Sequence, residues 1–119
     1  MRLKQAQAFV TVAELAVDDE DAYNGGVAAS VAVLAGIAAS DAACCARLGR
    51  RSRGQDHAGA IDLLKTVQPD GVALANDLGR LLAIKDNVHY GTLVISSRDA
   101  KAAVNRARRM TETVARMLA

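Results

Sequence analysis

The sequence predicts an all-α protein: an antiparallel four-helix up-and-down bundle with one additional short helix, in a single domain over residues 1–119. Hydrophobic residues make up 51% of the chain but aromatic residues only 3%, and much of the apolar content is alanine. Alanine favours helices and is depleted in strands. Proline occurs once, and apolar residues recur every three or four positions, which is the helical period.

The first two helices follow from this spacing. A first helix is predicted over residues 2–17, where the apolar stripe comprises Leu3, Ala6, Val10 and Ala13. The Asn-Gly-Gly sequence at 24–26 indicates a turn or a weak helix start. The second helix runs to Leu48, and Gly49 suits the left-handed conformation that ends many helices.

The middle of the chain predicts a short helix and a longer one. Asp56 can cap the short third helix, whose apolar stripe is His57, Ile61, Leu64 and Val67. Pro69 lies near the start of a fourth helix, where its missing N–H is tolerated. This helix continues to His89, and Gly91 ends it.

The final helix follows a short β-prone run. Residues 92–95 are too few to form a sheet alone. Ser96 or Ser97 caps the helix that follows. Its predicted buried stripe consists of Ala103, Val104, Ala107, Met110, Val114 and Met117.

The second helix also carries an extensive alanine face. Such a face indicates either very close packing within the chain or the docking of a second copy of the protein. Cys44 and Cys45 are adjacent on the same helix, where neighbouring side chains diverge by about 100° and cannot readily bond to each other. We expect both to be small, reduced core residues.

Ionisable residues interrupt two apolar stripes. One stripe of the second helix reads Leu34, Ile37, Asp41, Cys44 and Leu48. Lys85 continues the stripe of the fourth helix four residues after Leu81. Because a buried charge requires a partner, we expect Asp41 and Lys85 to meet, with His57 at their edge and His89 one turn beyond Lys85.

This cluster has two interpretations. In the first, the charged residues pair with one another inside the bundle and fix the register of the helices. In the second, they line a cleft and form a catalytic or binding site. A histidine moves protons at neutral pH, and a lysine stabilises developing negative charge. Asp41, His57, Lys85 and His89 are therefore candidate catalytic residues for metal-independent RNA cleavage, and the same groups would also hold a nucleotide without cutting it.

Metal, cofactor and membrane sites are not predicted. The histidines, cysteines and Asp41 lack the spacing of metal ligands, and no glycine-rich phosphate loop is present, so neither a metal nor a cofactor is expected. A signal peptide is not expected at the N-terminus, and the apolar run 27–39 is too short to span a bilayer. We expect a cytoplasmic protein with no membrane partner.

The net charge of +2 excludes a general polyelectrolyte binder, so any binding of nucleic acid must depend on local clusters. The basic stretch that spans the end of the second helix and the loop after it is the candidate binding surface, and its arginines are Arg47, Arg50, Arg51 and Arg53. The alternative is that these arginines belong to solvated faces and helix caps.

Three segments, 38–42, 49–57 and 85–91, together resemble the HEPN superfamily. In this sequence they read AASDA, GRRSRGQDH and KDNVHYG. The resemblance implies a compact helical bundle that is often a homodimer. Many members are RNases, including toxins paired with nucleotidyltransferase antitoxins, and others are non-catalytic partners of nucleotidyltransferases.

Catalytic members of that superfamily carry an arginine, four to six residues, and then a histidine, often with a tyrosine just beyond. By resemblance His89 stands for the histidine and Tyr90 for the tyrosine. The arginine is missing at this spacing, because eight residues separate Arg80 from His89 and only three separate Lys85 from it. The resemblance implies a variant pocket of Asp41, His57, Lys85 and Tyr90.

Two functions are therefore expected to compete. The first is a HEPN-like protein that binds RNA or a nucleotide, as a variant RNase or as the partner of a nucleotidyltransferase. The second is a non-catalytic helical homodimer that serves as a structural or protein-interaction module, with Asp41 and Lys85 as its buried register-setting pair.

Overall fold

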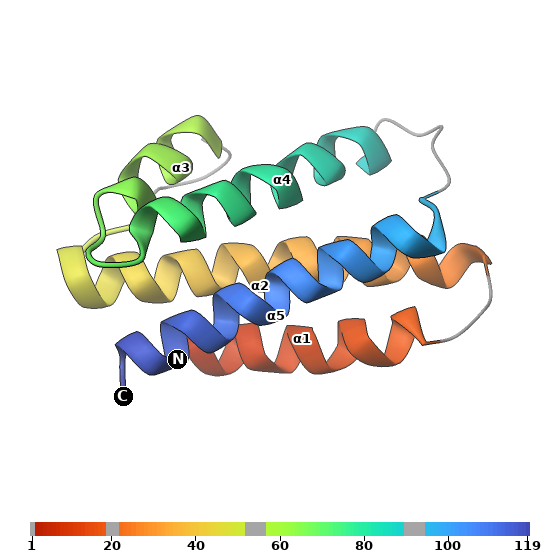
Figure 1. Ribbon diagram of the computed structural model, residues 1–119, viewed down its shortest axis with the longest axis horizontal. Coiled ribbons are helices and arrows are strands. Elements are labelled where there is room, and N and C mark those ends of the chain that lie inside the picture. The colour runs from red at the N-terminus through yellow and green to blue at the C-terminus, as the bar shows by residue number, and fades with distance from the viewer. Residues whose placement is uncertain (1, 19–21, 52–56, 90–94) are drawn as a thin grey trace.

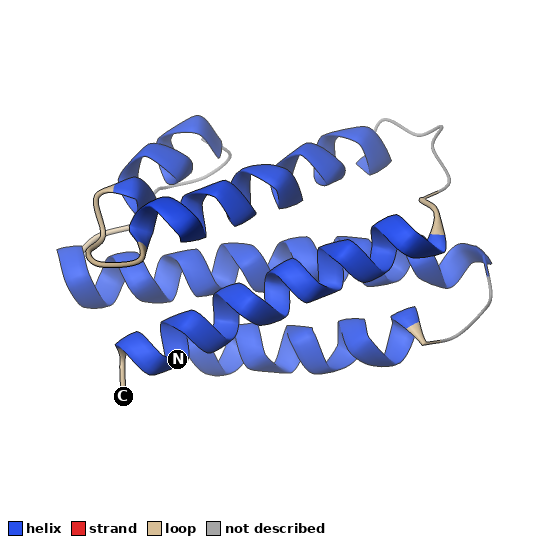
Figure 2. Ribbon diagram, viewed as in Figure 1, coloured by secondary structure: helices blue, strands red, loops and turns tan. Residues whose placement is uncertain are grey.

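The computed structural model describes residues 2–18, 22–51, 57–89 and 95–119, and of these 22–24 and 86–89 are described by backbone alone. Every regular element in these ranges is a helix, which confirms the all-α class (Figure 2). The helices are α1 (Arg2–Val17), α2 (Ala22–Leu48), α3 (His57–Lys65), α4 (Gly71–His89) and α5 (Ser97–Met117).

Helix α2 lies at the centre of the molecule and contacts each of the other four helices (Figure 1). Its neighbours α1 and α4 both run in the opposite direction to it (Figure 1). The helix begins at Ala22, so residues 24–26 belong to its start, and of the two predicted alternatives the structure shows the helix start rather than the turn. At Gly25 an added Cβ atom would lie 3.4 Å from the Ile95 carbonyl oxygen and 3.7 Å from Ala100 Cβ, so packing against these residues outweighs the low helix propensity of glycine.

The alanine face of α2 forms the inside of the core. Its fully buried members are Ala28, Ala29, Ala32, Ala35, Ala38, Ala39 and Ala43. At Gly36 the neighbours approach so closely that an added Cβ would lie 2.6 Å from Leu81 Cδ1 and 3.5 Å from Met110 Sδ. The alanine face therefore packs within the chain, as in the first of the two predicted alternatives, and is closed to a second copy.

The helix ends carry the capping groups that the sequence predicts. Gly49 adopts a φ of 70°, and its N–H donates to the Cys45 carbonyl at 3.1 Å. Ser96, rather than Ser97, caps α5, since its hydroxyl accepts from the Asp99 N–H at 3.1 Å. The predicted Asp56 cap, the Gly91 stop and the β-prone residues 92–94 lie outside the described residues.

Helix α3 folds back on α4 through a tight turn. The turn contains a cis Gln68–Pro69 peptide, and the Gly71 N–H donates to the Val67 carbonyl at 2.8 Å. Pro69 thus precedes the first residue of α4 by two positions, close to its predicted place. Ile61 of α3 lies 3.7 Å from the position of a Cβ on Gly79, so the two helices pack side by side.

The predicted stripe of α5 is confirmed. Five of its six members are buried against α1, α2 and α4, and Met117 is partly buried. The segment Gly25–Leu48 of α2 is long and apolar enough, by length and composition, to cross a membrane, and 67% of its most apolar window is buried inside the molecule. This apolar segment is longer than the run considered from the sequence.

Candidate functional site

Asp41 lies between two arginines. Its Oδ2 atom accepts a hydrogen bond from Arg2 Nη2 at 2.8 Å and lies 3.5 Å from Arg51 Nη1. The Asp41 side chain is 16% exposed, compared with 31% for Arg2 and 53% for Arg51. The carboxylate thus joins the first turn of α1 to α2 and to the segment that follows α2. We call these three residues the Asp41 cluster.

The predicted pair of Asp41 with Lys85 is wrong, and helix register explains why. Gly36 of α2 faces Leu78 and Leu81 of α4, and the two helices run in opposite directions. Lys85 lies further along α4 and is therefore level with about residue 31 of α2. At 1.5 Å per residue, this separates Lys85 from Asp41 by about 15 Å along the helix axis.

The stripe on which Asp41 lies is also turned differently from the prediction. Leu34, a member of the same stripe, is 46% exposed, while the alanines occupy the inside of α2. Small side chains allow the neighbouring helices to approach most closely, so they set which face of α2 points inward. Asp41 therefore lies at the edge of the core, where arginines reach it from solvent.

Arg2 is held on both sides. Its Nη1 donates to Gln5 Oε1 within α1, and its Nη2 donates to Asp41. The Arg2 Nε is buried and has no hydrogen-bond partner in the described part of the chain. Arg2 did not enter the predicted site. Its position on the same stripe of α1 as Phe9, at helical spacing, is the sequence signal that places it against α2.

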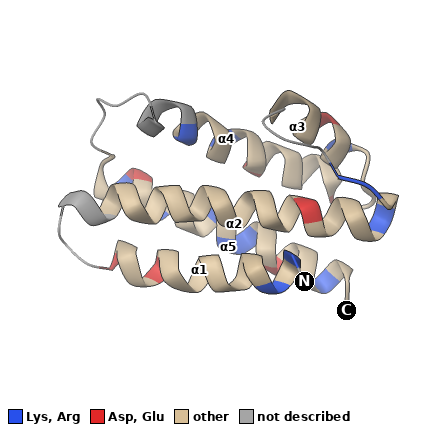
Figure 3. Cartoon of the chain, turned by 180° about the vertical axis from the view of Figure 1, so that it is seen from behind, with Lys and Arg blue, Asp and Glu red and all other residues tan. Residues whose placement is uncertain are grey.

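Basic residues gather at the end of the molecule where α2 and α5 finish and α1 begins (Figure 3), and the Asp41 cluster lies at this end. Arg47 Nη2 donates to the Met117 carbonyl of α5 at 2.5 Å, which brings Arg116 to the same end. We call this surface the basic end, and its members are Arg2, Lys4, Arg47, Arg50, Arg51 and Arg116.

The structure thus groups three of the four predicted binding arginines. Arg47, Arg50 and Arg51 are all exposed, while Arg53 and the predicted Tyr90 lie outside the described residues. Arg51 makes only a loose contact with Asp41, so most of the five N–H donors of its guanidinium face solvent.

The remaining candidate catalytic residues lie elsewhere. His57 is the first residue of α3, as predicted. Because Ile61 packs beside Gly79 in an opposed helix pair, His57 is level with about residue 83 of α4, within one turn of Lys85. Both side chains are partly buried. The side chain of His89 lies outside the described residues.

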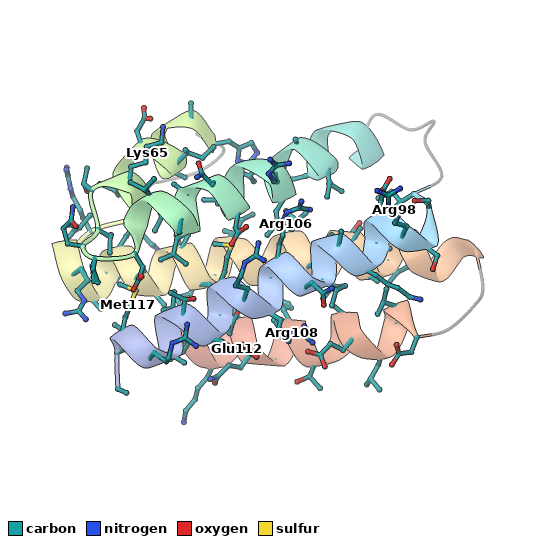
Figure 4. The ribbon with its side chains drawn as sticks, viewed as in Figure 1. Lys65, Arg98, Arg106, Arg108, Glu112 and Met117 are labelled. Carbon is teal, nitrogen blue, oxygen red and sulfur yellow. The ribbon has the colours of Figure 1, made fainter. Side chains whose placement is uncertain are left out.

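A groove of about 290 Å³ lies between α1 and α5. Its charged lining combines carboxylates from α1 with cations from α5, namely Glu14, Asp18, Lys101 and Arg108. Arg108 lies on the side of α5 that faces α1 (Figure 4), and its Nη2 donates to Asn105 Oδ1 at 3.0 Å. The residues that line the groove are far apart in the sequence. The spacing of residues along a single helix therefore does not predict the groove.

A second ion pair ties α4 to α5 away from these sites. Arg109 donates to both oxygens of Asp77, from Nη2 at 2.6 Å and from Nε at 3.1 Å. The hydrogen bonds to Asp77 raise the pKa of Arg109 above its ordinary value. This bidentate contact has the geometry of a structural bridge, since it occupies the fork of the guanidinium.

The two cysteines differ in their surroundings. Cys44 is buried and Cys45 is exposed, so the prediction of a core residue is confirmed for Cys44 and wrong for Cys45. Both are free thiols. Burial raises the pKa of the Cys44 thiol, against a smaller opposing effect of its hydrogen bond with Ser40.

No three His, Cys, Asp or Glu side chains of the described residues come together as a set of metal ligands. Comparisons of the chain with models of protein families, with curated proteins and with solved structures gave no match.

Proposed function

We propose that this chain binds the phosphate groups of RNA or of a nucleotide at the basic end. The observation that carries the proposal is the exposure of Arg50 and Arg51 beside Arg47, whose guanidinium is held by a hydrogen bond to the Met117 carbonyl. Arginine is well suited to this role, because its planar fork bonds to two phosphate oxygens at once.

The two tethers prepare the surface for a ligand. The Met117 carbonyl fixes one edge of the Arg47 guanidinium, and Asp41 attracts the Arg51 guanidinium through a looser contact. A side chain that is already positioned loses less conformational entropy when it binds. The surplus of cations over the single carboxylate of the Asp41 cluster leaves a positive surface for an anionic ligand.

The proposal includes the wider assignment that the resemblance implies. In this proposal the fold is a HEPN-like up-and-down bundle of α1, α2, α4 and α5, with α3 as the additional short helix. The protein acts in the cytoplasm, in a toxin-antitoxin-like context or as the partner of a nucleotidyltransferase. The packing of α2 against all of the other helices supports a bundle.

Binding to a labelled single-stranded RNA, followed by fluorescence anisotropy at increasing salt, tests the proposal. We expect the affinity to fall steeply with salt, because phosphate contacts release counterions. Arg50→Gln should reduce the slope of log K against log salt by about one. Arg98→Gln removes the same charge from an exposed position at the first turn of α5, at the far end of the molecule (Figure 4), and should leave the slope unchanged.

Two results would overturn this function: no binding of either RNA or a nucleotide at 50 mM salt, or equal losses in Arg50→Gln and Arg98→Gln. Calorimetric titration with ATP and GTP distinguishes the two kinds of ligand. A nucleotide site gives saturable one-to-one binding, whereas RNA binding without a nucleotide site gives none.

A second candidate is a metal-independent RNase, and the similar height of His57 on α3 and Lys85 on α4 supports it. In that reaction a base removes the proton of the 2′-hydroxyl, the 2′-oxygen attacks phosphorus, and the bond to the 5′-oxygen breaks as an acid gives that oxygen a proton, so the products are a 2′,3′-cyclic phosphate and a 5′-hydroxyl. We expect RNA to be cut in EDTA, with loss of cleavage in His57→Ala, Lys85→Ala or His89→Ala. Intact RNA after incubation with the native protein would remove this candidate.

A further inference from the structure

The groove between α1 and α5 is separate from the basic end. The two helices are antiparallel, so the last turns of α1 lie beside the first turns of α5, whereas the basic end lies where α1 begins and α5 finishes (Figure 1). The volume of the groove is about 290 Å³, which suits a small molecule rather than a polymer.

The wall of the groove that α1 provides accepts hydrogen bonds. It consists of Glu14 and Asp18, which are four residues apart and therefore lie on one face of the helix. Glu14 is partly buried and Asp18 is exposed. Ionised carboxylates are acceptors only, so this side of the groove favours a ligand group that carries N–H donors and positive charge. We call it the α1 wall.

The opposite wall donates hydrogen bonds. It consists of Lys101, Asn105 and Arg108, whose spacing of four and three residues places them on one face of α5. The Arg108 Nη2 atom donates to Asn105 Oδ1 at 3.0 Å, which engages the acceptor of the amide. The amide N–H groups of Asn105, the other N–H groups of Arg108 and the Lys101 ammonium stay available as donors. We call this side the α5 wall.

The charges of the two walls do not neutralise each other. Within the described part of the chain, neither carboxylate of the α1 wall forms an ion pair or a hydrogen bond with a cation of the α5 wall. By contrast, Arg109 and Asp77 meet directly at 2.6 Å on another side of α5. The floor of the groove is apolar, because it contains Val104, which is 3% exposed, and Val17, which is partly buried.

We propose that this groove binds a free α-amino acid with an apolar side chain. The ammonium group of the ligand donates to the α1 wall, its carboxylate accepts from the α5 wall, and its side chain lies against the valines of the floor. Hydrogen bonds between charged groups are the strong ones, and a zwitterion forms them on both sides at once. An anion would face the carboxylates of the α1 wall, and a polyamine would face the cations of the α5 wall.

Titration of the native protein with L-leucine, followed by two-dimensional NMR of the backbone amides, tests the proposal. The exposed side chains of the walls lose rotamer freedom on binding, so we expect a Kd of about 0.1–1 mM. The shifted amides should belong to the second half of α1 and the first half of α5. The proposal is independent of phosphate binding at the basic end, because the two sites share no residue.

Three analogues of L-leucine test which groups of the ligand are recognised. L-leucinamide lacks the carboxylate and N-acetyl-L-leucine lacks the ammonium group, so each should bind about tenfold more weakly than L-leucine. Glycine keeps both charges but has no side chain to place on the floor, so it should also bind more weakly. Equal affinities of L-leucine and all three analogues would overturn the proposal.

Charge-removing variants locate the site. Arg108→Gln and Glu14→Gln should each weaken the binding of L-leucine about tenfold. Arg106→Gln is the matched control, because residues 106 and 108 are about 200° apart around α5, and Arg106 lies on the side toward α4 (Figure 4). It should leave the affinity unchanged. Circular dichroism should show folded protein in all three variants, since none of these side chains is in the core.

Two results would overturn the site. One is the absence of saturable shifts up to about 10 mM L-leucine, well above the expected Kd. The other is an equal loss of affinity in Arg108→Gln and Arg106→Gln, which would mean that the ligand responds to the overall charge of α5 rather than to the groove.

Discussion

Replacing Asp41 by asparagine should lower the free energy of unfolding by about 1.5 kcal/mol. The carboxylate forms a direct hydrogen bond with Arg2 and a looser contact with Arg51, and its side chain is 16% exposed. Exposed ion pairs contribute about 0–1 kcal/mol, and breaking a buried pair costs about 3–5 kcal/mol. The Asp41 cluster is partly buried, so its value should lie between these limits.

The expected change in melting temperature follows from the size of the chain. An unfolding entropy of about 2.1 cal/mol/K per residue gives about 0.25 kcal/mol/K for this protein. A loss of about 1.5 kcal/mol should therefore lower Tm by about 6 °C. Urea denaturation followed by circular dichroism measures the same change at 25 °C, and the m value should not change, because the fold is retained.

A double-mutant cycle identifies the partner of Asp41. Combining Asp41→Asn with Arg2→Met should give a coupling energy of about 1 kcal/mol, because the residues are in contact. Combining Asp41→Asn with Lys85→Met is the matched control, and its coupling energy should be about zero, since about 15 Å separates the residues along the helix axis. A coupling to Lys85 as large as that to Arg2 would refute the register of α2 against α4.

Three further predictions concern the core, one thiol and a cap. Gly36→Ala should destabilise the protein by about 1–3 kcal/mol in urea denaturation, because the added methyl group overpacks the core. Gly26→Ala lies in open space and should stabilise the protein by up to about 1 kcal/mol. Destabilisation by both variants would contradict the packing described for α2. Because burial raises the pKa of the Cys44 thiol above its ordinary 9.0, the native state holds that proton more tightly, and its contribution to stability is present below pH 9 and is lost as the pH rises further. In urea titrations from pH 7 to 10, Cys44→Ala should lose less stability at alkaline pH than the native protein does, whereas Cys45→Ala should lose as much. Identical pH dependence of stability in all three proteins would argue against a raised pKa of Cys44. Ser96→Ala removes the α5 cap and should cost about 1 kcal/mol in thermal unfolding, while an unchanged Tm would mean that the cap contributes nothing.

The sequence predicts local features of the fold well, because capping is chemistry between residues that are close in the chain. Gly49 ends α2 and Ser96 begins α5, as expected from a residue that tolerates positive φ and from a hydroxyl that accepts an N–H. The bounds of α1 agree for the same reason, since a single helical period continues from Arg2 to Val17. The expectations for residues 52–56 and 90–94 stay predictions, because these residues lie outside the described ranges.

The site was harder to predict, because it depends on which faces of two helices meet and at what height. Spacing along α2 shows that Leu34 and Asp41 share a stripe but does not show whether that stripe points inward. Because Leu34 is large and hydrophobic, the sequence favours an inward position for its stripe. In the structure the alanines point inward instead, because their small side chains allow the neighbouring helices to approach α2 closely. The register between α2 and α4 then separates Asp41 from Lys85, and no pattern within one helix contains that register.

The alanine face of α2 also restricts how the protein can change. An alanine loses no rotamer freedom when it is buried, so ordering this face costs little beyond the backbone. The same tight fit leaves no room for a larger side chain, so only residues of similar or smaller size are tolerated there. The outward face of the same helix carries no such restriction. Substitutions can accumulate on that side and alter what the molecule associates with, while the inner face preserves the fold.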